Sequence, residues 1–372
     1  DDTKWYAEQL ASDSDFVIAG NLLIEYVPKE QQNLVTLPIE VTAIKEEAFM
    51  GNTDIVTIEF HSYVEFIGQR AFYGCSSLIN VDFGLAELSS ISHVGEQAFD
   101  NTPWKSLEEK YIIVGTVLIQ YVGTETEIND LPYYITLIDE GAFAYKAIEQ
   151  ITLSSELKKI NKRAFYNCFN LESVIIPEKV TFIGEEAFRN NTSLRTVIFE
   201  GNVVKEIGQK AFMGCSSLGS DVNNRILTLP EELEYLGEQA FEGCNSLTIV
   251  DMKDTDITEL KARTFYGASS LNQITLSKTI ETIGINAFTN CGVLETIKIG
   301  KDNEDASNSA LIHIANNALL NTAWYLRSVP EGEEDLLIYL GNVLLKYKQK
   351  EPSDIKPDVI LPNNIKYIAD SA

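Results

Sequence analysis

Aromatic and aliphatic residues recur along this chain at a nearly constant spacing. A short unit of the form Ile-Gly-x-x-Ala-Phe repeats, and its aromatic position returns every 22 to 31 residues apart from one gap of 44. The positions are Phe49, Phe72, Phe99, Phe143, Phe165, Phe188, Phe212, Phe241, Phe265, Phe288 and, as a degenerate copy, Leu319. An aliphatic residue always stands five positions earlier, from Ile44 to Ile314, so the register never slips.

A second apolar pattern usually opens six positions after the aromatic residue. It reads Leu-x-x-Ile-x-Ile, as in Leu171 to Ile176 and Leu294 to Ile299, and its last residues alternate as in a half-buried strand. Each copy has too few apolar residues to form a core alone, whereas stacked copies would align Phe on Phe and Ile on Ile. The pattern therefore predicts a mainly β solenoid whose strands pair into one long parallel sheet.

The residue that follows the repeated aliphatic position is usually small. It is glycine in Gly68, Gly95, Gly184, Gly208, Gly237 and Gly284. Asp139 and Asn161 take the place in two further copies, and this set predicts a bend that tolerates a positive φ angle. Lys45, Lys261 and Ala315 stand there in the remaining copies, so a positive φ is not obligatory.

The combined pattern is nearly complete from Ile67 to Phe83 and from Ile283 to Ile299, and it resembles the BspA-like leucine-rich-repeat family. The resemblance covers nearly the whole chain. It implies a right-handed, curved leucine-rich-repeat array with short helical or 3-10 turns. Members of that family are bacterial and protozoan cell-surface or secreted proteins, and several are implicated in adhesion to host proteins. An extracellular or cell-surface location follows as an expectation.

Three stretches, near residues 1–36, 100–133 and 320–360, depart from the repeat. Each contains one of the three tryptophans, Trp5, Trp104 and Trp324, followed by two apolar runs around a glycine. We expect β-hairpins that turn at Gly20, Gly115 and Gly341. The tryptophans either pack into the solenoid or project an aromatic edge for binding.

These variant stretches also bear on domain organisation. Thr3-Lys-Trp5 matches the other two without the repeat unit that should precede it, and the chain stops one residue before the next expected aromatic position. We expect one continuous solenoid over residues 1–372 with both ends cut within the array.

Side chains that could carry chemistry follow the repeat. Each of the five cysteines lies three residues after a repeat Phe, at Cys75, Cys168, Cys215, Cys244 and Cys291, which predicts buried free thiols. The three histidines, His61, His93 and His313, have no second ligand at metal spacing. Motifs of hydrolases, P-loop proteins and zinc proteases are missing. We therefore predict no enzyme, and no catalytic, metal or cofactor site.

Acidic residues are abundant. Pairs such as Glu46-Glu47 and Glu185-Glu186 occupy variable repeat positions and are interpreted as a solvated face. A calcium site in the loops Asp251–Asp256 and Asp302–Asp305 stays open as an alternative, although neither loop has the spacing of a calcium loop. With 29 Lys and Arg against 55 Asp and Glu, the net charge of −26 disfavours nucleic acid and anionic membranes as partners. No apolar run reaches the roughly 18 residues that cross a bilayer. We expect a monomer without direct membrane insertion.

The strands offer a surface for a partner. The second, third and fifth positions of Leu-x-x-Ile-x-Ile should face outward and form rows that are free to vary. The fifth-position row consists of Glu59, Asp82, Thr152, Ile175, Ile198, Thr228, Asp251, Thr275 and Lys298. Ile175 and Ile198 are neighbours in it, and this apolar pair is the favoured contact site, against the alternative of ordinary surface aliphatics.

Two functions are compatible with these observations. The first is a non-enzymatic adhesion or ligand-binding module for an extracellular protein or glycan. The second is a stiff spacer arm of a larger surface protein with no ligand of its own. The sequence does not identify the ligand.

Overall fold

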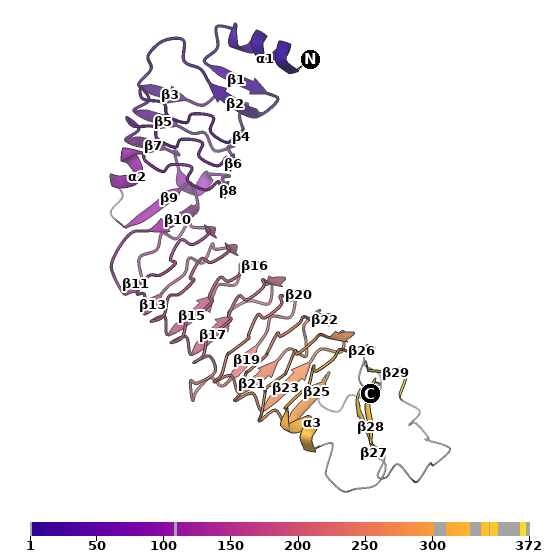
Figure 1. Cartoon of the computed structure of the whole chain (residues 1–372). Coiled ribbons are helices and arrows are strands. Elements are labelled where there is room, and N and C mark those ends of the chain that lie inside the picture. The colour runs from indigo at the N-terminus through magenta and orange to yellow at the C-terminus, as the bar shows by residue number, and fades with distance from the viewer. Residues whose placement is uncertain are drawn as a thin grey trace. The chain divides into compact units, whose positions relative to one another are not determined.

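The computed structural model describes residues 2–107, 110–300, 310–327, 336–341, 343–348 and 365–369 (Figure 1). The chain forms two compact units. The first contains residues 1–124 and 132–142, and the second contains residues 125–131 and 143–372.

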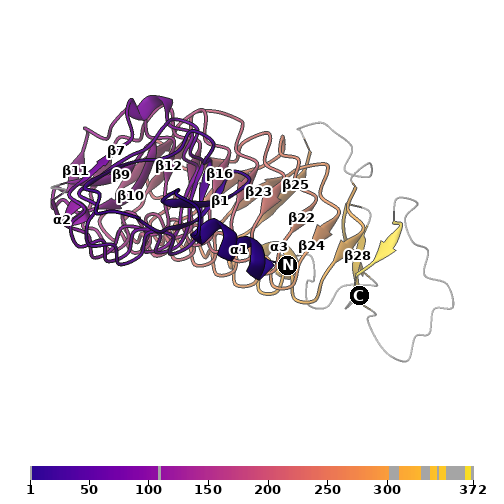
Figure 2. The same cartoon turned by 90° about the horizontal axis from the view of Figure 1, so that it is seen from above.

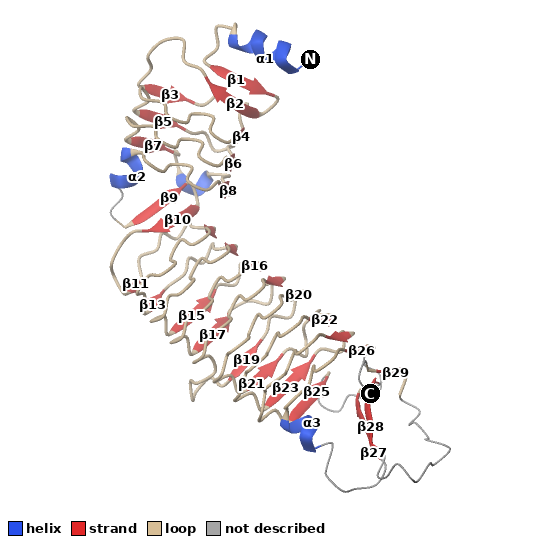
Figure 3. Cartoon of the chain, viewed as in Figure 1, coloured by secondary structure: helices blue, strands red, loops and turns tan. Residues whose placement is uncertain are grey.

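The first unit consists of short strands joined by turns, with few helical segments (Figure 3). Its helical segments are α1 (Asp2–Leu10), η1 (Ala86–Leu88) and α2 (Pro103–Leu107). Its strands are β1 (Phe16–Ala19), β2 (Leu22–Tyr26), β3 (Leu34–Thr36), β4 (Ala43–Ile44), β5 (Thr57–Glu59), β6 (Phe66–Ile67), β7 (Asn80–Asp82), β8 (His93–Val94), β9 (Tyr111–Val114), β10 (Val117–Tyr121) and β12 (Leu137–Ile138). Helix α1 lies beside β1 (Figure 2).

The second unit repeats the same pattern over more coils. Its long strands are β11 (Glu127–Ile128), β13 (Gln150–Ile151), β15 (Ser173–Ile176), β17 (Thr196–Phe199), β19 (Ile226–Thr228), β21 (Ile249–Asp251), β23 (Gln273–Leu276) and β25 (Thr296–Ile299). Its two-residue strands are β14 (Lys159–Ile160), β16 (Phe182–Ile183), β18 (Glu206–Ile207), β20 (Tyr235–Leu236), β22 (Glu259–Leu260), β24 (Thr282–Ile283) and β26 (His313–Ile314). Helix α3 (Ala323–Arg327) and strands β27 (Leu336–Leu340), β28 (Val343–Lys348) and β29 (Tyr367–Ile368) follow.

Each coil contributes strands to two parallel ladders on opposite sides of its unit (Figure 1). The Leu-x-x-Ile-x-Ile segments form the long-strand ladder, for example β3-β5-β7 in the first unit and β19-β21-β23-β25 in the second. The Ile-Gly segments form the short-strand ladder, for example β4-β6-β8 and β14-β16-β18-β20. The mainly β solenoid is thus confirmed. The expected single long sheet is replaced by two ladders, because the two residues before each glycine also pair from coil to coil. Each ladder is divided into several sheets.

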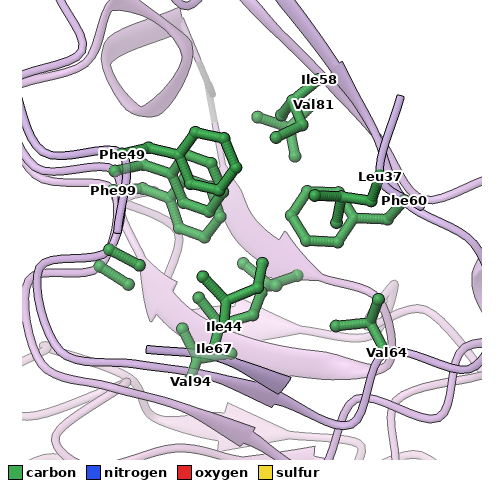
Figure 4. Packing of buried hydrophobic residues seen from close by; sticks show 14 of the residues in the cluster. Leu37, Ile44, Phe49, Ile58, Phe60, Val64, Ile67, Val81, Val94 and Phe99 are labelled. Atoms are coloured by element: carbon green, nitrogen blue, oxygen red, sulfur yellow. The ribbon is translucent and has the colours of Figure 1, made fainter. Parts of the chain in front are cut away.

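Columns of identical side chains fill the interior between the two ladders. Phe49, Phe72 and Phe99 stack with ring centroids 4.6 and 4.9 Å apart, beside a column of Ile44, Ile67 and Val94 (Figure 4). In the second unit the stack runs from Phe143 to Phe288 with spacings of 4.9 to 5.6 Å. A buried Phe contributes about 1.5–3 kcal/mol by area alone, so these columns are a main source of stability.

The variant stretches contain the expected hairpins. β1–β2, β9–β10 and β27–β28 are antiparallel and turn at Gly20, Gly115 and Gly341, each with a positive φ. Part of the third variant stretch lies outside the described residues. Tyr26 of the first hairpin donates its backbone N–H to Ala48 and stacks on Phe49 at 5.0 Å. The hairpin thereby keeps the aromatic column in place of an ordinary coil.

A short helix precedes each hairpin and carries its tryptophan, which was not predicted. Trp104 is buried against Phe99, whereas Trp5 is exposed and Trp324 is partly exposed. Thr102 starts α2 by accepting a hydrogen bond from the Lys105 N–H, and Thr322 does the same for the Tyr325 N–H. The packed alternative is confirmed for Trp104, whereas a binding role for the exposed Trp5 stays a prediction.

The repeat glycines do not have the positive φ that was expected of them. A Cβ at Gly68, for example, would lie only 2.4 Å from the backbone nitrogen of Glu46 in the preceding coil. At Gly68 the adjacent backbones approach so closely that a side chain would collide with the preceding coil. The N–H groups of Lys45 and Asp139 donate to the Leu23 and Leu118 carbonyls of the hairpin strands β2 and β10, as the Gly68 N–H donates to the Ile44 carbonyl of an ordinary coil.

The Ala-Phe turn uses positive φ on both sides of the aromatic residue. The residue two before it has φ between 54° and 66° in every copy, usually with a long polar side chain such as Arg70 or Glu186. The residue two after it is Gly or Asn in every copy except that of Tyr145. Glycine and asparagine adopt this conformation at the lowest cost.

One member of the acidic pairs corrects the interpretation of a fully solvated face. Glu186 is only 3% exposed and pairs with Arg163 and Arg189. Burial by itself raises its pKa, but hydrogen bonds from the two guanidinium groups outweigh that effect and leave the pKa below its ordinary value. Glu46 and Glu47, in contrast, are exposed.

Candidate binding face

The outward side of the long-strand ladder is the surface that the repeat leaves free to vary. Residues at the fourth and sixth positions point inward, as the buried Val174 and Ile176 of β15 show, and those at the fifth alternate outward. Because paired strands are in register, the outward residues of successive coils form rows on one face.

The nine residues of the expected row divide between the two units. Glu59 and Asp82 pair in register in the first unit, and the other seven belong to the second. Thr36, which the sequence analysis did not include, precedes Glu59 in the row and donates its hydroxyl to the Glu59 carboxylate at 2.7 Å. Asp82 accepts the backbone N–H of Gly84 at 2.7 Å. This part of the row is polar and acidic.

The seven residues in the second unit follow one another along the ladder. Thr152 donates its hydroxyl to Asn129 at 3.1 Å, and Ile175 pairs directly with Ile198. Farther along the chain, four neighbouring strands pair so that their fifth-position residues lie next to one another. These residues are Thr228, Asp251, Thr275 and Lys298.

Thr275 departs from the expected exposure. Thr275 is only 9% exposed, although it occupies an outward position. It lies in register between Asp251 and Lys298, whose side chains are longer and flank the shorter threonine. Thr275 therefore offers little surface to a partner.

The neighbouring Asp251 pairs with Lys253, and this hydrogen bond raises the pKa of the lysine.

The apolar part of the face is larger than the expected pair. Ile175 and Ile198 are 47% and 41% exposed, and Ile226, the first residue of β19 and the third position of its repeat pattern, is 51% exposed. β17 and β19 are in contact, so Ile226 lies on the coil next to Ile198. Val222, in the loop before β19, is 70% exposed. These four residues are called the isoleucine patch below.

The loop that carries Val222 is attached to the sheet. The Thr196 hydroxyl in β17 donates to the Asp221 carboxylate at 3.3 Å, and the Gly219 N–H donates to the Arg195 carbonyl at 2.9 Å. The loop lengthens the coil between Phe212 and Phe241 to 29 residues. That gap and the outward Ile226 were both visible in the sequence, so the larger patch could have been found by comparing third positions as well.

Chemically reactive side chains are not gathered on this face. Each cysteine Sγ is buried and donates to the backbone carbonyl of the repeat Phe in the coil before its own, at 3.0–3.2 Å. Cys168, for example, donates to Phe143. Burial raises the pKa of the Cys215 thiol to about 12. These thiols are packing groups whose nucleophilic form is suppressed.

The histidines and acidic loops are likewise dispersed. His61 Nε2 contacts the Pro38 carbonyl at 2.9 Å, and His93 stacks on Phe66. Within the described ranges, His, Cys, Asp and Glu do not cluster in groups of three or more that could hold a metal ion. Asp251 and Asp254 of the first acidic loop pair with Lys253. The second loop, Asp302–Asp305, lies outside the described residues.

One cavity lies near the last described coil. It has a volume of about 90 Å³, and Leu319, Leu345 and Tyr325 contribute to its largely apolar lining. None of the helices in the described ranges has the length and apolar character needed to span a bilayer.

Comparison with known proteins places the repeat in a family. A model of the BspA type leucine rich repeat region, in six copies, matches residues 29–113, 121–223 and 220–317. No curated protein matches.

Solved structures that resemble the chain are leucine-rich-repeat proteins and a vaccine antigen. A leucine-rich repeat protein of Eubacterium ventriosum is 20% identical over 84% of this chain and 91% of its own, with a TM-score of 0.39. A leucine rich cell surface protein of Faecalibacterium prausnitzii is 20% identical over 78% and 95%, with a TM-score of 0.30. The pneumococcal vaccine antigen PcpA is 19% identical over 95% and 90%, with a TM-score of 0.32.

Proposed function

Because this chain belongs to the BspA-type leucine-rich-repeat family, we propose that it is a non-enzymatic protein-interaction module displayed outside the cell. It binds an extracellular protein through the isoleucine patch of the second unit. The observation that carries the proposal is the in-register pair Ile175 and Ile198, which remain exposed on a face whose outward positions are otherwise mostly polar.

The composition of the patch favours a protein over a glycan. Its members, Ile175, Ile198, Val222 and Ile226, are all aliphatic, and on strands β11 to β25 no outward third or fifth position is aromatic. An exposed aliphatic patch among polar residues is typical of a protein-protein contact site. Glu172 and Arg195, on the same two coils as Ile175 and Ile198, form an ion pair that suits the polar margin of such an interface.

The thiols are compatible with a location outside the cell. Exported proteins meet oxidising conditions, in which exposed cysteines form disulfides or become modified. The five cysteines are buried, and burial raises the pKa of each thiol. A chain with such protected thiols tolerates export without a disulfide framework.

The test is a binding experiment with the full chain and a double variant, Ile175→Ser with Ile198→Ser. The probes are a panel of purified extracellular host proteins, with a glycan array beside it. We expect saturable binding to at least one protein, and an affinity loss of about tenfold or more in the variant, since each isoleucine contributes roughly 1 kcal/mol of apolar burial.

The matched control is Ile285→Ser with Val293→Ser, which removes two side chains of similar exposure, 53% and 45%, from the same unit outside the patch. This control should bind as the unaltered chain does. A folded chain that binds no protein on the panel would support the spacer arm and contradict the proposal. Binding to glycans alone, or an equal loss in the control, would contradict it as well.

A further inference from the structure

A second exposed apolar surface lies on the first unit, where three chain segments cross from the long-strand ladder to the short-strand ladder. The segments 37–42, 60–65 and 83–92 connect β3 to β4, β5 to β6 and β7 to β8. Both ladders are in register here, so the segments stack on one another. The Glu65 N–H donates to the Thr42 carbonyl at 2.8 Å, and the Ser90 N–H donates to the Ser62 carbonyl at 3.0 Å.

Large apolar side chains project from these segments into solvent. Ile39, Tyr63, Leu85 and Leu88 are between 61% and 65% exposed, and the neighbouring Phe66 is 41% exposed. The inward residues of the same segments, such as Phe60 and Val64, are buried (Figure 4). The core is thus complete without the five exposed side chains.

The two leucines come from an insertion. The coil from Phe72 to Phe99 has 27 residues, against 23 from Phe49 to Phe72. The inserted part includes η1, which has no buried residue. Exposing two leucines is unfavourable, and a coil of 23 residues closes without them. The core of this coil therefore does not require the two leucines.

Charge around these side chains has a single sign. Residues 34–44, 57–67 and 80–94 contain five carboxylates, Glu40, Glu59, Glu65, Asp82 and Glu87, and neither Lys nor Arg. Glu40, Glu65 and Glu87 are exposed beside the apolar side chains. The five apolar residues and these three glutamates are called the acidic apolar face below.

The geometry points to the acidic apolar face as a docking surface for a Lys- and Arg-rich amphipathic segment of another protein. The apolar side of such a segment covers Ile39, Tyr63, Leu85 and Leu88, and its basic side chains reach the surrounding carboxylates. A second copy of this chain fits poorly, because each copy carries a net charge of −26 and brings further negative charge to an acidic rim. This surface lies in the first unit, so the inference stands independently of the isoleucine patch.

The experiment uses the full chain and a designed probe, a helical peptide of about 18 residues with Leu on one face and Lys on the other. A counterpart with Glu in place of Lys controls for charge. We expect the Lys peptide to bind and the Glu peptide not to bind. Leu85→Ser with Leu88→Ser should weaken binding at least tenfold without changing any charge, since both leucines are covered in the complex.

Charge and position are tested separately. Glu65→Gln with Glu87→Gln should reduce the dependence of affinity on salt concentration, because two fewer carboxylates face the peptide. Ile175→Ser with Ile198→Ser, an equally uncharged change in the second unit, should leave peptide binding unaltered. Far-UV circular dichroism verifies that the exposed substitutions keep the fold.

Three results would overturn the inference. One is equal affinity for the Glu peptide, and another is an unchanged affinity after the loss of both leucines. The third is self-association of the unaltered chain in analytical ultracentrifugation that the two leucine substitutions abolish, since the occupant would then be a second copy.

Discussion

At the scale of single residues, the position three after each repeat Phe shows how one site accepts different side chains. Cysteine fits there because its thiol is small and donates to the backbone carbonyl of the repeat Phe in the coil before. Asn52 at the same position accepts the backbone N–H groups of Asp54 and Ile55, both at 2.9 Å. Asn191 is fully buried, and neither its side-chain oxygen nor its nitrogen has a hydrogen-bond partner. An unpaired buried amide is unfavourable.

We predict that Asn191→Cys stabilises the protein by about 1–2 kcal/mol. The substitution removes two unpaired polar atoms and supplies the residue that neighbouring coils already use. Urea denaturation followed by circular dichroism measures the change. Asn52→Cys is the control and should destabilise by about 1 kcal/mol, because it removes a paired acceptor. A loss of stability in Asn191→Cys would mean that the amide is paired in solution.

At the scale of the elements, some short segments were predictable and others were overlooked. The three hairpins followed from apolar runs around Gly20, Gly115 and Gly341. The helix at Pro103 was overlooked, although Thr102 followed by Pro103 combines a favourable N-cap with a proline in the first turn. The short-strand ladder could not be read from two residues per coil, because its pairing depends on how closely the coils approach.

Two glycines allow the effect of close contact between coils to be measured separately from that of backbone conformation. Gly208 has no positive φ, but a Cβ there would lie 2.6 Å from the Glu185 nitrogen in the preceding coil. Gly267 has a φ of +72°, and a Cβ would meet nothing within 4 Å. Steric contact governs the first position and backbone conformation governs the second.

We predict that Gly267→Ala costs about 1 kcal/mol and that Gly208→Ala costs about 2–3 kcal/mol. Gly267→Asn should cost less than Gly267→Ala, since asparagine adopts positive φ more readily and stands at this place in Asn167 and Asn290. Chemical denaturation of the three variants gives the order. A smaller cost at Gly208 than at Gly267 would show that the coils can separate to accept a methyl group.

At the scale of the whole molecule, the buried thiols couple stability to pH. Cys75 lies in the first unit, and Cys168, Cys215, Cys244 and Cys291 lie in the second. Burial raises the pKa of Cys75 to about 11 and that of Cys168, Cys215 and Cys291 to about 12, from an ordinary value of 9.0. In the unfolded chain the thiols lose their protons near pH 9, whereas in the folded chain they keep them.

Stability from these groups is therefore complete below pH 9 and is lost as the pH rises toward 12. We predict a loss of about 1.4 kcal/mol per pH unit for each thiol above pH 9, concentrated in the second unit. Limited proteolysis between pH 8 and pH 11, read by mass spectrometry, should locate the earliest cleavage there. Replacing the four thiols of that unit with alanine, which Ala268 shows to fit this position, should flatten the dependence. Equal alkaline sensitivity with and without the thiols would contradict this account.

The sequence by itself determined the repeat, the columns of Phe and Ile, the hairpins and the inward and outward sides of the long strands. These depend on periodicity, because a side chain that recurs in register is buried in the same place in every coil. Only the tertiary structure decided which outward residues are exposed. Thr275 is covered by its neighbours, the Val222 loop is tied to β17, and Glu186 is enclosed by two arginines. In each case at least one of the residues that decide exposure comes from an adjacent coil, more than 20 positions away in the chain, so the pattern within one repeat does not encode it alone.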